Sequence, residues 1–256
     1  YLDIYFGNID IRLGKQQIIW GKADGVFITD IISPKDLGEF LLPDFEEIRI
    51  GVDAVKLNYY RGDHTIELVW LPRFQPMIFP EAASIWAPRM MEFPMTPTFD
   101  YSNATMASNL ENSEFALKYS ALTSLIDFEL MGGYLWDDNP TFHVSKSMDT
   151  ATQQLTGLTI FPEYHRLSLT GGSFSTTLGA WVLRGEGAYY SGKFFNSSNP
   201  AYANSTVQKD YVHYLLSGFS RFFTRDPEFA TVRLLWFQQP RRADPSQTDL
   251  RLCRRI

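Results

Sequence analysis

Apolar and polar residues alternate along most of the chain with a period of two residues. The first thirteen residues alternate in this way on both sides of Gly7-Asn8, and two such runs joined by a Gly-Asn turn predict a tight β-hairpin. Similar alternating runs follow at 52–60, 65–71, 114–119, 126–136, 164–169, 181–189, 209–221 and 230–236. We therefore expect about ten β-strands and an all-β fold, because helical periodicity is weak everywhere except over 81–92.

The predicted connections alternate between short and long. Short connections are expected at 7–8, 61–64, 121–124, 171–176 and 222–228, and long ones at 21–47, 73–112, 137–159 and 192–208. A soluble β-sandwich has no physical reason to place all its long loops at one end. Outer-membrane barrels have short periplasmic turns and long extracellular loops. The pattern therefore favours an antiparallel transmembrane β-barrel over 1–239, with an irregular tail at 240–256; a soluble protein with the same strands is the alternative.

A membrane barrel also explains strands that carry both charged and apolar residues, because one face meets lipid and the other meets water. The stretch RLGKQQIIWGKADG at 12–25 is of this kind. Strict alternation from Ile9 would place Lys15 and Gln17 in lipid. A bulge at Gly14 would turn them inward; otherwise they lie above the membrane.

Charges of both signs fall on the strand faces that are predicted to point inward. These predicted lumen residues are Arg12, Lys56, Glu67, Glu114, Lys118, Asp127, Glu129, Arg166, Arg184, Glu186 and Arg233. A ring of one sign would select ions of the opposite sign, whereas a mixed set indicates salt bridges or a transverse field across the lumen. Arg184 and Glu186 are expected to join a network across the lumen. Ordinary solvated charge is the alternative interpretation.

The loop at 73–101 is unusually rich in methionine, proline and aromatic residues. Its candidate gating residues are Phe74, Met77, Phe79, Trp86, Met90, Met91, Phe93 and Met95. So much apolar area is not expected to face open water. We expect this loop to fold into the barrel mouth as a gate, to pack on a neighbouring subunit, or to dip into the outer leaflet. Packing that serves stability alone is the alternative.

Composition excludes several other classes of function. The 256 residues carry a net charge of −6, and no basic surface suited to nucleic acid is concentrated anywhere. Cys253 is the only cysteine, so neither a disulfide framework nor a thiolate metal site is expected. The four histidines are scattered without metal-ligand spacing, and no Ser–His–acid arrangement can be established. We therefore expect no metal, no cofactor and no enzymatic activity, and no apolar run is long enough for a membrane-spanning helix.

Two stretches carry a family resemblance. RLGKQ with the following WG, at 12–21, precedes an Asp-rich loop, and GAWVLRGEGAYYSGKFF occupies 179–195. Both resemble a large, poorly characterised family of porin-like proteobacterial outer-membrane β-barrels, known as a numbered domain of unknown function. The resemblance implies a barrel in the outer membrane of a Gram-negative bacterium, and it supplies no substrate and no catalytic residues. Because the chain shows no leader and ends in a basic, turn-rich tail, we expect a partial barrel or an altered end.

Three functions follow as expectations. The first is a porin-like channel for the passage or uptake of small solutes, amphipathic ones included. The second is a barrel that serves as a scaffold or anchor, and the third is a soluble all-β binding protein. The expected partners are outer-membrane lipid and a small-molecule solute, without nucleic acid, and the sequence leaves the oligomeric state open.

Overall fold

The structure is a computed structural model. It describes residues 1–21, 28–39, 47–81, 83–87, 95–104, 106–149, 152, 154–179, 181–197, 205–220 and 233–240, without the side chains of 217–220 and 233–240. These parts of the chain are all-β, with two sheets and one short 3-10 turn, η1 (Ser102–Ala104). In the described ranges, no helix has the length and apolar character needed to cross a membrane.

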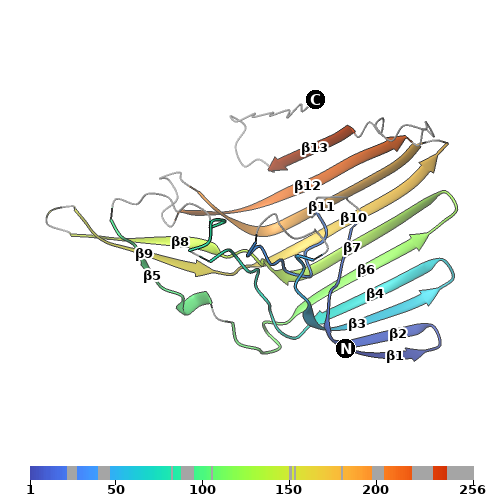
Figure 1. The fold of residues 1–256 in the computed structure, drawn as a ribbon, viewed down its shortest axis with the longest axis horizontal. Coiled ribbons are helices and arrows are strands. Elements are labelled where there is room, and N and C mark those ends of the chain that lie inside the picture. The colour runs from blue at the N-terminus through green and yellow to red at the C-terminus, as the bar shows by residue number, and fades with distance from the viewer. Residues whose placement is uncertain are drawn as a thin grey trace.

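Ten strands form the main sheet, which is antiparallel throughout. In spatial order they are β1 (Leu2–Phe6), β2 (Ile9–Gln16), β3 (Val52–Arg61), β4 (His64–Leu71), β6 (Glu114–Leu122), β7 (Ile126–Trp136), β10 (Arg166–Leu178), β11 (Trp181–Asn196), β12 (Thr206–Ser220) and β13 (Arg233–Pro240). Figure 1 shows them side by side, with the short turns gathered at one end. The expected all-β fold of about ten strands is confirmed. As described, the sheet is open with β1 and β13 at its edges, so closure into a transmembrane barrel stays a prediction.

A smaller sheet lies beyond the opposite end of the strands (Figure 1). It consists of β5 (Thr98–Phe99), β9 (Leu155–Glu163) and β8 (Thr141–Met148), in the order β5-β9-β8. β8 and β9 form an antiparallel hairpin, and β5 pairs with β9 in parallel. The long connections predicted at 73–112 and 137–159 therefore contain strands of their own.

The turn predicted at 171–176 is wrong. β10 continues without a break from Arg166 to Leu178, and Gly171 lies inside it. A Cβ atom at Gly171 would lie 2.8 Å from the carbonyl oxygen of Gly187 and 3.0 Å from Cγ2 of Thr29. Glycine at this position therefore permits a close approach to the strand, and it does not mark a turn.

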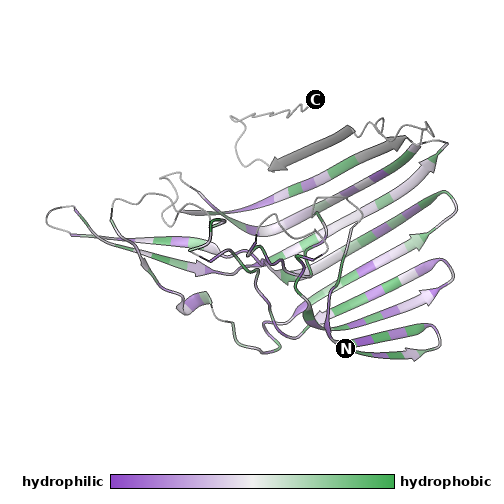
Figure 2. Cartoon of the chain, viewed as in Figure 1, coloured by the Kyte–Doolittle hydropathy of each residue, from purple (hydrophilic) through white to green (hydrophobic). Residues whose placement is uncertain are grey.

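The two faces of the main sheet differ in what covers them. On the outer face, Leu68, Phe115 and Leu130 have exposed fractions of 47%, 54% and 57%, respectively. On the inner face, neighbours such as Val69 and Met131 are buried. Figure 2 shows the underlying alternation as hydrophobic and hydrophilic bands along the strands. The inner face is therefore the side on which the rest of the chain packs.

The end of β2 keeps this alternation. Gly14 pairs with Ala54 in a register that continues through Gln16, so the structure has no bulge at Gly14, although its φ is +108°. Gln16 is buried, whereas Lys15 and Gln17 are exposed. The two polar residues thus keep the outward parity at the end of the strand, so the bulge expectation is wrong, and their place above the membrane stays a prediction.

Candidate functional site on the inner face of the sheet

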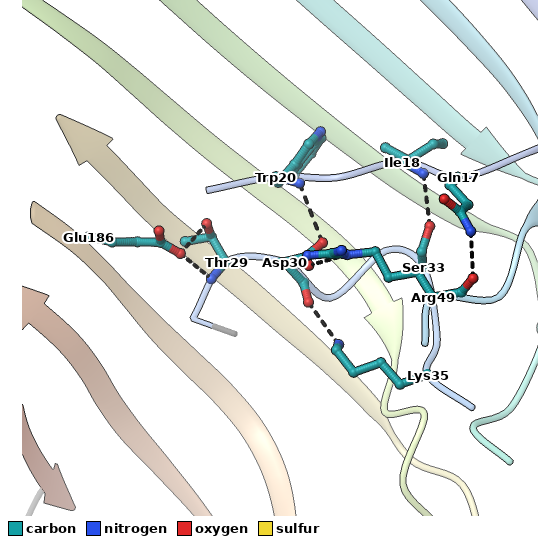
Figure 3. Close-up of polar contacts among 9 residues, drawn as sticks. All are labelled: Gln17, Ile18, Trp20, Thr29, Asp30, Ser33, Lys35, Arg49 and Glu186. Carbon is teal, nitrogen blue, oxygen red and sulfur yellow. Dashed lines mark hydrogen bonds and ion pairs between the residues drawn. The ribbon is translucent and has the colours of Figure 1, made fainter. Parts of the chain in front are cut away.

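After β2 the chain folds back over the inner face of the main sheet. We call residues 16–21 and 28–35 the inner segment. Its apolar side chains join the core formed with the strands of the main sheet, and its buried members of that core are Ile18, Trp20, Ile28 and Ile32. The range 21–47 was predicted to be a long extracellular loop, and of its described residues those at 28–35 pack against the sheet. Figure 3 shows the polar contacts that accompany this packing.

Glu186 of β11 anchors one end of the inner segment. Its Oε1 accepts hydrogen bonds from the backbone N–H and the hydroxyl of Thr29, both at 2.7 Å. The Tyr190 hydroxyl, four residues further along the same strand, donates to the carbonyl oxygen of Ile28. A Cβ atom on Gly21, whose φ is +87°, would lie 2.6 Å from Oγ1 of Thr29 and closer still to the Glu186 carboxylate. Gly21 therefore allows the chain to pass this anchor.

Glu67 of β4 holds the inner segment at Trp20. Its carboxylate accepts a hydrogen bond of 2.5 Å from the indole Nε1–H of Trp20. Lys118 of β6 places its ammonium 3.8 Å from the same Glu67 oxygen and 5.5 Å from the centre of the Trp20 ring. Because the carboxylate is buried, the indole N–H and the ammonium offset part of the cost of removing its charge from water.

Hydrogen bonds around Asp30 also hold the inner segment, some of them internal and one to Arg49 outside it. The Asp30 carboxylate accepts a hydrogen bond of 2.7 Å from Nε of Arg49, and its backbone oxygen accepts one of 3.0 Å from Lys35 (Figure 3). Ser33 Oγ accepts a hydrogen bond from the backbone N–H of Ile18 at 2.8 Å. Burial lowers the pKa of the Lys35 ammonium, against the opposing influence of the Asp30 carboxylate. These bonds give the inner segment a defined conformation.

Three predicted lumen residues, Glu67, Lys118 and Glu186, thus meet the inner segment. The others lie elsewhere on the sheet. Arg12 forms an ion pair with Asp3 at 2.7 Å, Glu114 accepts a hydrogen bond from the backbone N–H of Trp136, and Glu129 accepts one from the Ser173 hydroxyl. In the strand register, Lys56 lies opposite Arg12 and Val69, and Asp127 and Arg184 both lie opposite Ser175. The structure therefore divides the predicted set. Part of it anchors the inner segment, part lies nearer the short turns or the β1 edge, and Glu114 lies at the end of the sheet opposite the short turns.

Two of the arginines differ from the predicted face. Arg166 pairs with Trp136, and its guanidinium lies 4.2 Å from the centre of that ring and 4.8 Å from the exposed ring of Tyr134. Its inward placement was wrong, because the apolar residues that alternate with it in β10 are buried beneath the inner segment. Arg233 pairs with Gly218, and Gly218 pairs with Leu183. Arg233 therefore has the parity of Leu183 on the outer face and not that of Arg184 on the inner face. The Arg233 side chain lies outside the described part of the chain.

The loop at 73–101 is only partly described. Phe74 packs on Trp136 and Tyr164, with ring centres 6.2 and 4.9 Å apart. The backbone of Met77 donates to Asp138, Phe79 is exposed, and Trp86 and Met95 are half-buried. Met90, Met91 and Phe93 lie outside the described residues. The gating role of this loop stays a prediction. The inner face is packed by the inner segment, whose part at 16–21 was interpreted from the sequence as strand and family motif and not as a covering of that face.

Comparison with known families gives one match. A family model described as a protein of unknown function (DUF1302) matches residues 2–251. The chain belongs to this family. The match spans the main sheet, the inner segment and the smaller sheet of this DUF1302 protein, and it confirms membership of a family of unknown function, as the resemblance at 12–21 and 179–195 implied. No curated protein and no solved structure matches the chain.

The close approach at Gly171 gives a first prediction. Alanine at Gly171 should destabilise the DUF1302 protein by about 1–3 kcal/mol, because a Cβ atom there overlaps the backbone of β11 and the Thr29 side chain. Alanine at Gly132 is the matched control, since its Cβ atom would meet a backbone oxygen at an ordinary 3.5 Å. Urea unfolding in detergent measures both variants. Equal costs would show that the inner segment does not need the space above Gly171.

Proposed function

We propose that this DUF1302 protein forms the wall of a porin-like channel in the outer membrane of a Gram-negative bacterium, through which small solutes, amphipathic ones included, pass. The observation that carries the proposal is the contrast between the two faces of one sheet. Apolar side chains are exposed on the outer face, and the inner face holds charged side chains and the inner segment. A soluble monomer rarely exposes such a continuous apolar surface.

Strand length supports the same proposal. A tilted strand needs about 9–11 residues to cross the hydrocarbon core of a bilayer. β3 has 10 residues, β7 has 11, β10 has 13 and β11 has 16. These strands are therefore long enough to cross. In lipid the backbone groups at the β1 and β13 edges would need partners, so the channel requires the sheet to be closed by further pairing.

The inner segment gives the proposed channel its constriction. Its buried side chains and its anchors at Glu67 and Glu186 hold it against the wall, on the side where water and solute would pass. Lys56, Asp127 and Arg184 carry both signs of charge on the remaining inner face. A mixed set favours polar solutes of either sign over a strong ion preference.

Planar bilayers test the proposal. The protein, purified without a tag and folded into detergent micelles, should give stepwise conductance on insertion and should migrate faster on a gel before heating than after it. Folded, heat-modifiable protein without conductance would instead favour the scaffold or anchor function. Monodisperse protein in buffer without detergent would contradict the membrane location and would favour a soluble binding protein.

A further inference from the structure

Two histidines and a glutamate meet where the smaller sheet joins the main sheet. His143 belongs to β8, Glu163 is the last residue of β9, and His165 lies just before β10. His143 Nε2 lies 3.0 Å from Nε2 of His165 and 3.5 Å from Oε2 of Glu163. Ligand atoms of all three side chains lie within 4.8 Å of one another, and this grouping meets the geometric requirement for holding one metal ion.

The separation of the two nitrogens suits a shared ion. Imidazole nitrogens bind zinc at about 2.0–2.1 Å. Two nitrogens 3.0 Å apart at that bond length subtend an angle of about 90° at the ion, and the neighbouring carboxylate supplies a third ligand. A direct hydrogen bond between the two rings is the alternative interpretation of the same distance, and cobalt(II) titration distinguishes the two.

Neighbouring side chains hold both rings in place. His143 stacks on Phe161 with ring centres 5.3 Å apart, and its Nδ1 lies 3.4 Å from Oγ1 of Thr206 in β12. His165 stacks on Phe194 of β11 with centres 3.8 Å apart. If His143 donates its Nδ1–H to Thr206, its Nε2 carries the lone pair that a metal needs. The side chain of Glu163 is 40% exposed, which leaves a path for an ion to enter.

We propose that His143, Glu163 and His165 bind one divalent transition-metal ion of the zinc class. Two imidazoles and a carboxylate suit zinc, copper or nickel better than calcium or magnesium, which prefer sets of oxygen ligands. The ion would connect the β8–β9 hairpin to the start of β10. The hairpin is already joined to β11 there by hydrogen bonds between Asn196 and the backbone of Phe142. This proposal is independent of the channel function.

The sequence analysis expected no metal because it looked for ligands at fixed spacing along the chain. His143 and His165 are 22 residues apart. They meet because the β8–β9 register pairs Thr141 with Glu163 and His143 with Phe161. The hairpin therefore brings the end of β9, and His165 just after it, back beside the start of β8. Hairpin register is not visible in a spacing motif.

Cobalt(II) titration of the purified, tag-free Cys253→Ser protein tests the site, since cobalt reports its coordination by visible absorption and the substitution removes the only thiol. We expect one cobalt ion per chain, displaced by zinc. His143→Gln and His165→Gln should each weaken cobalt binding by at least about a hundredfold, and Glu163→Gln by at least about tenfold. His64→Gln is the matched control: it removes a histidine that bonds Tyr119 in the turn region and should bind cobalt like the parent.

A second readout separates binding from misfolding. Zinc should raise the melting temperature of the parent and of His64→Gln, because a ligand that binds only the folded state stabilises it. Zinc should leave the melting temperatures of His143→Gln and His165→Gln unchanged. If those variants do not fold, Glu163→Gln decides, because its side chain is partly exposed. Absence of cobalt binding in the folded parent, or parental affinity in any of the three cluster variants, would overturn the proposal.

Discussion

Arginine in place of Leu68 should destabilise the protein in a bilayer by about 2–4 kcal/mol, the cost of an arginine facing lipid near the midplane of a membrane barrel. Leu68 is 47% exposed on the outer face of β4 and lies in register between Leu57 and Leu117. The residues directly opposite it on both neighbouring strands are therefore apolar, and an arginine there would have no charged residue directly across from it. Urea titration of the protein folded into lipid vesicles measures the change in the free energy of folding.

Asn58→Arg is the matched control for this experiment. Asn58 lies on the adjoining strand, pairs in register with Glu67, and belongs to the inner face. An added guanidinium there would face water and a carboxylate, so its cost should stay below about 1 kcal/mol. Equal costs at the two positions would show that the faces are assigned wrongly or that the sheet does not meet lipid.

Alanine in place of Glu186 should release the inner segment and raise the single-channel conductance. The substitution removes an acceptor that takes two hydrogen bonds from Thr29. A hydrogen bond to a charged group contributes about 1.5–3 kcal/mol, and the buried N–H of Thr29 would be left without its acceptor. We therefore expect a loss of about 3 kcal/mol in the local stability of the segment, measured by hydrogen exchange at Thr29 and its neighbours.

Two further variants sharpen the result for Glu186. Glu129→Ala removes a carboxylate from the same face of β7, two strands away from β11, where it accepts a hydrogen bond from Ser173. It should change conductance little. Glu186→Gln keeps an oxygen acceptor and should lie between Glu186→Ala and the parent. Parental conductance in a folded Glu186→Ala protein would show that the inner segment does not narrow the passage.

Alternation of side chains predicted much of the fold, because burial on one face of a sheet imposes a period of two. It failed where the inner face is not uniformly polar. Leu167 and Leu169 are buried beneath the inner segment, so the charged residue beside them, Arg166, was assigned to the wrong face. Gly171 was mistaken for part of a turn because close approach of a distant segment leaves no local signal.

The candidate sites were less predictable than the strands. Glu67, Lys118 and Glu186 were identified as inward-facing charges, but their shared role depends on contacts with Trp20 and Thr29. Thr29 meets Glu186 across 157 positions of the chain. Only the folded backbone brings such residues together, and the same is true of His143, Glu163 and His165. Sequence pattern therefore indicated which residues were polar and inward, and tertiary packing decided what they bind.

The most direct test of a membrane wall is quenching of a fluorophore by brominated lipid. Single cysteines are introduced into the Cys253→Ser protein at Leu117 and Leu130 on the outer face and at Lys56 and Asn58 on the inner face. Each is labelled with an environment-sensitive fluorophore and folded into vesicles whose acyl chains carry bromine. We expect strong quenching at Leu117 and Leu130 and little at Lys56 and Asn58. Equal quenching at all four positions, or none at the outer two, would contradict the proposed wall.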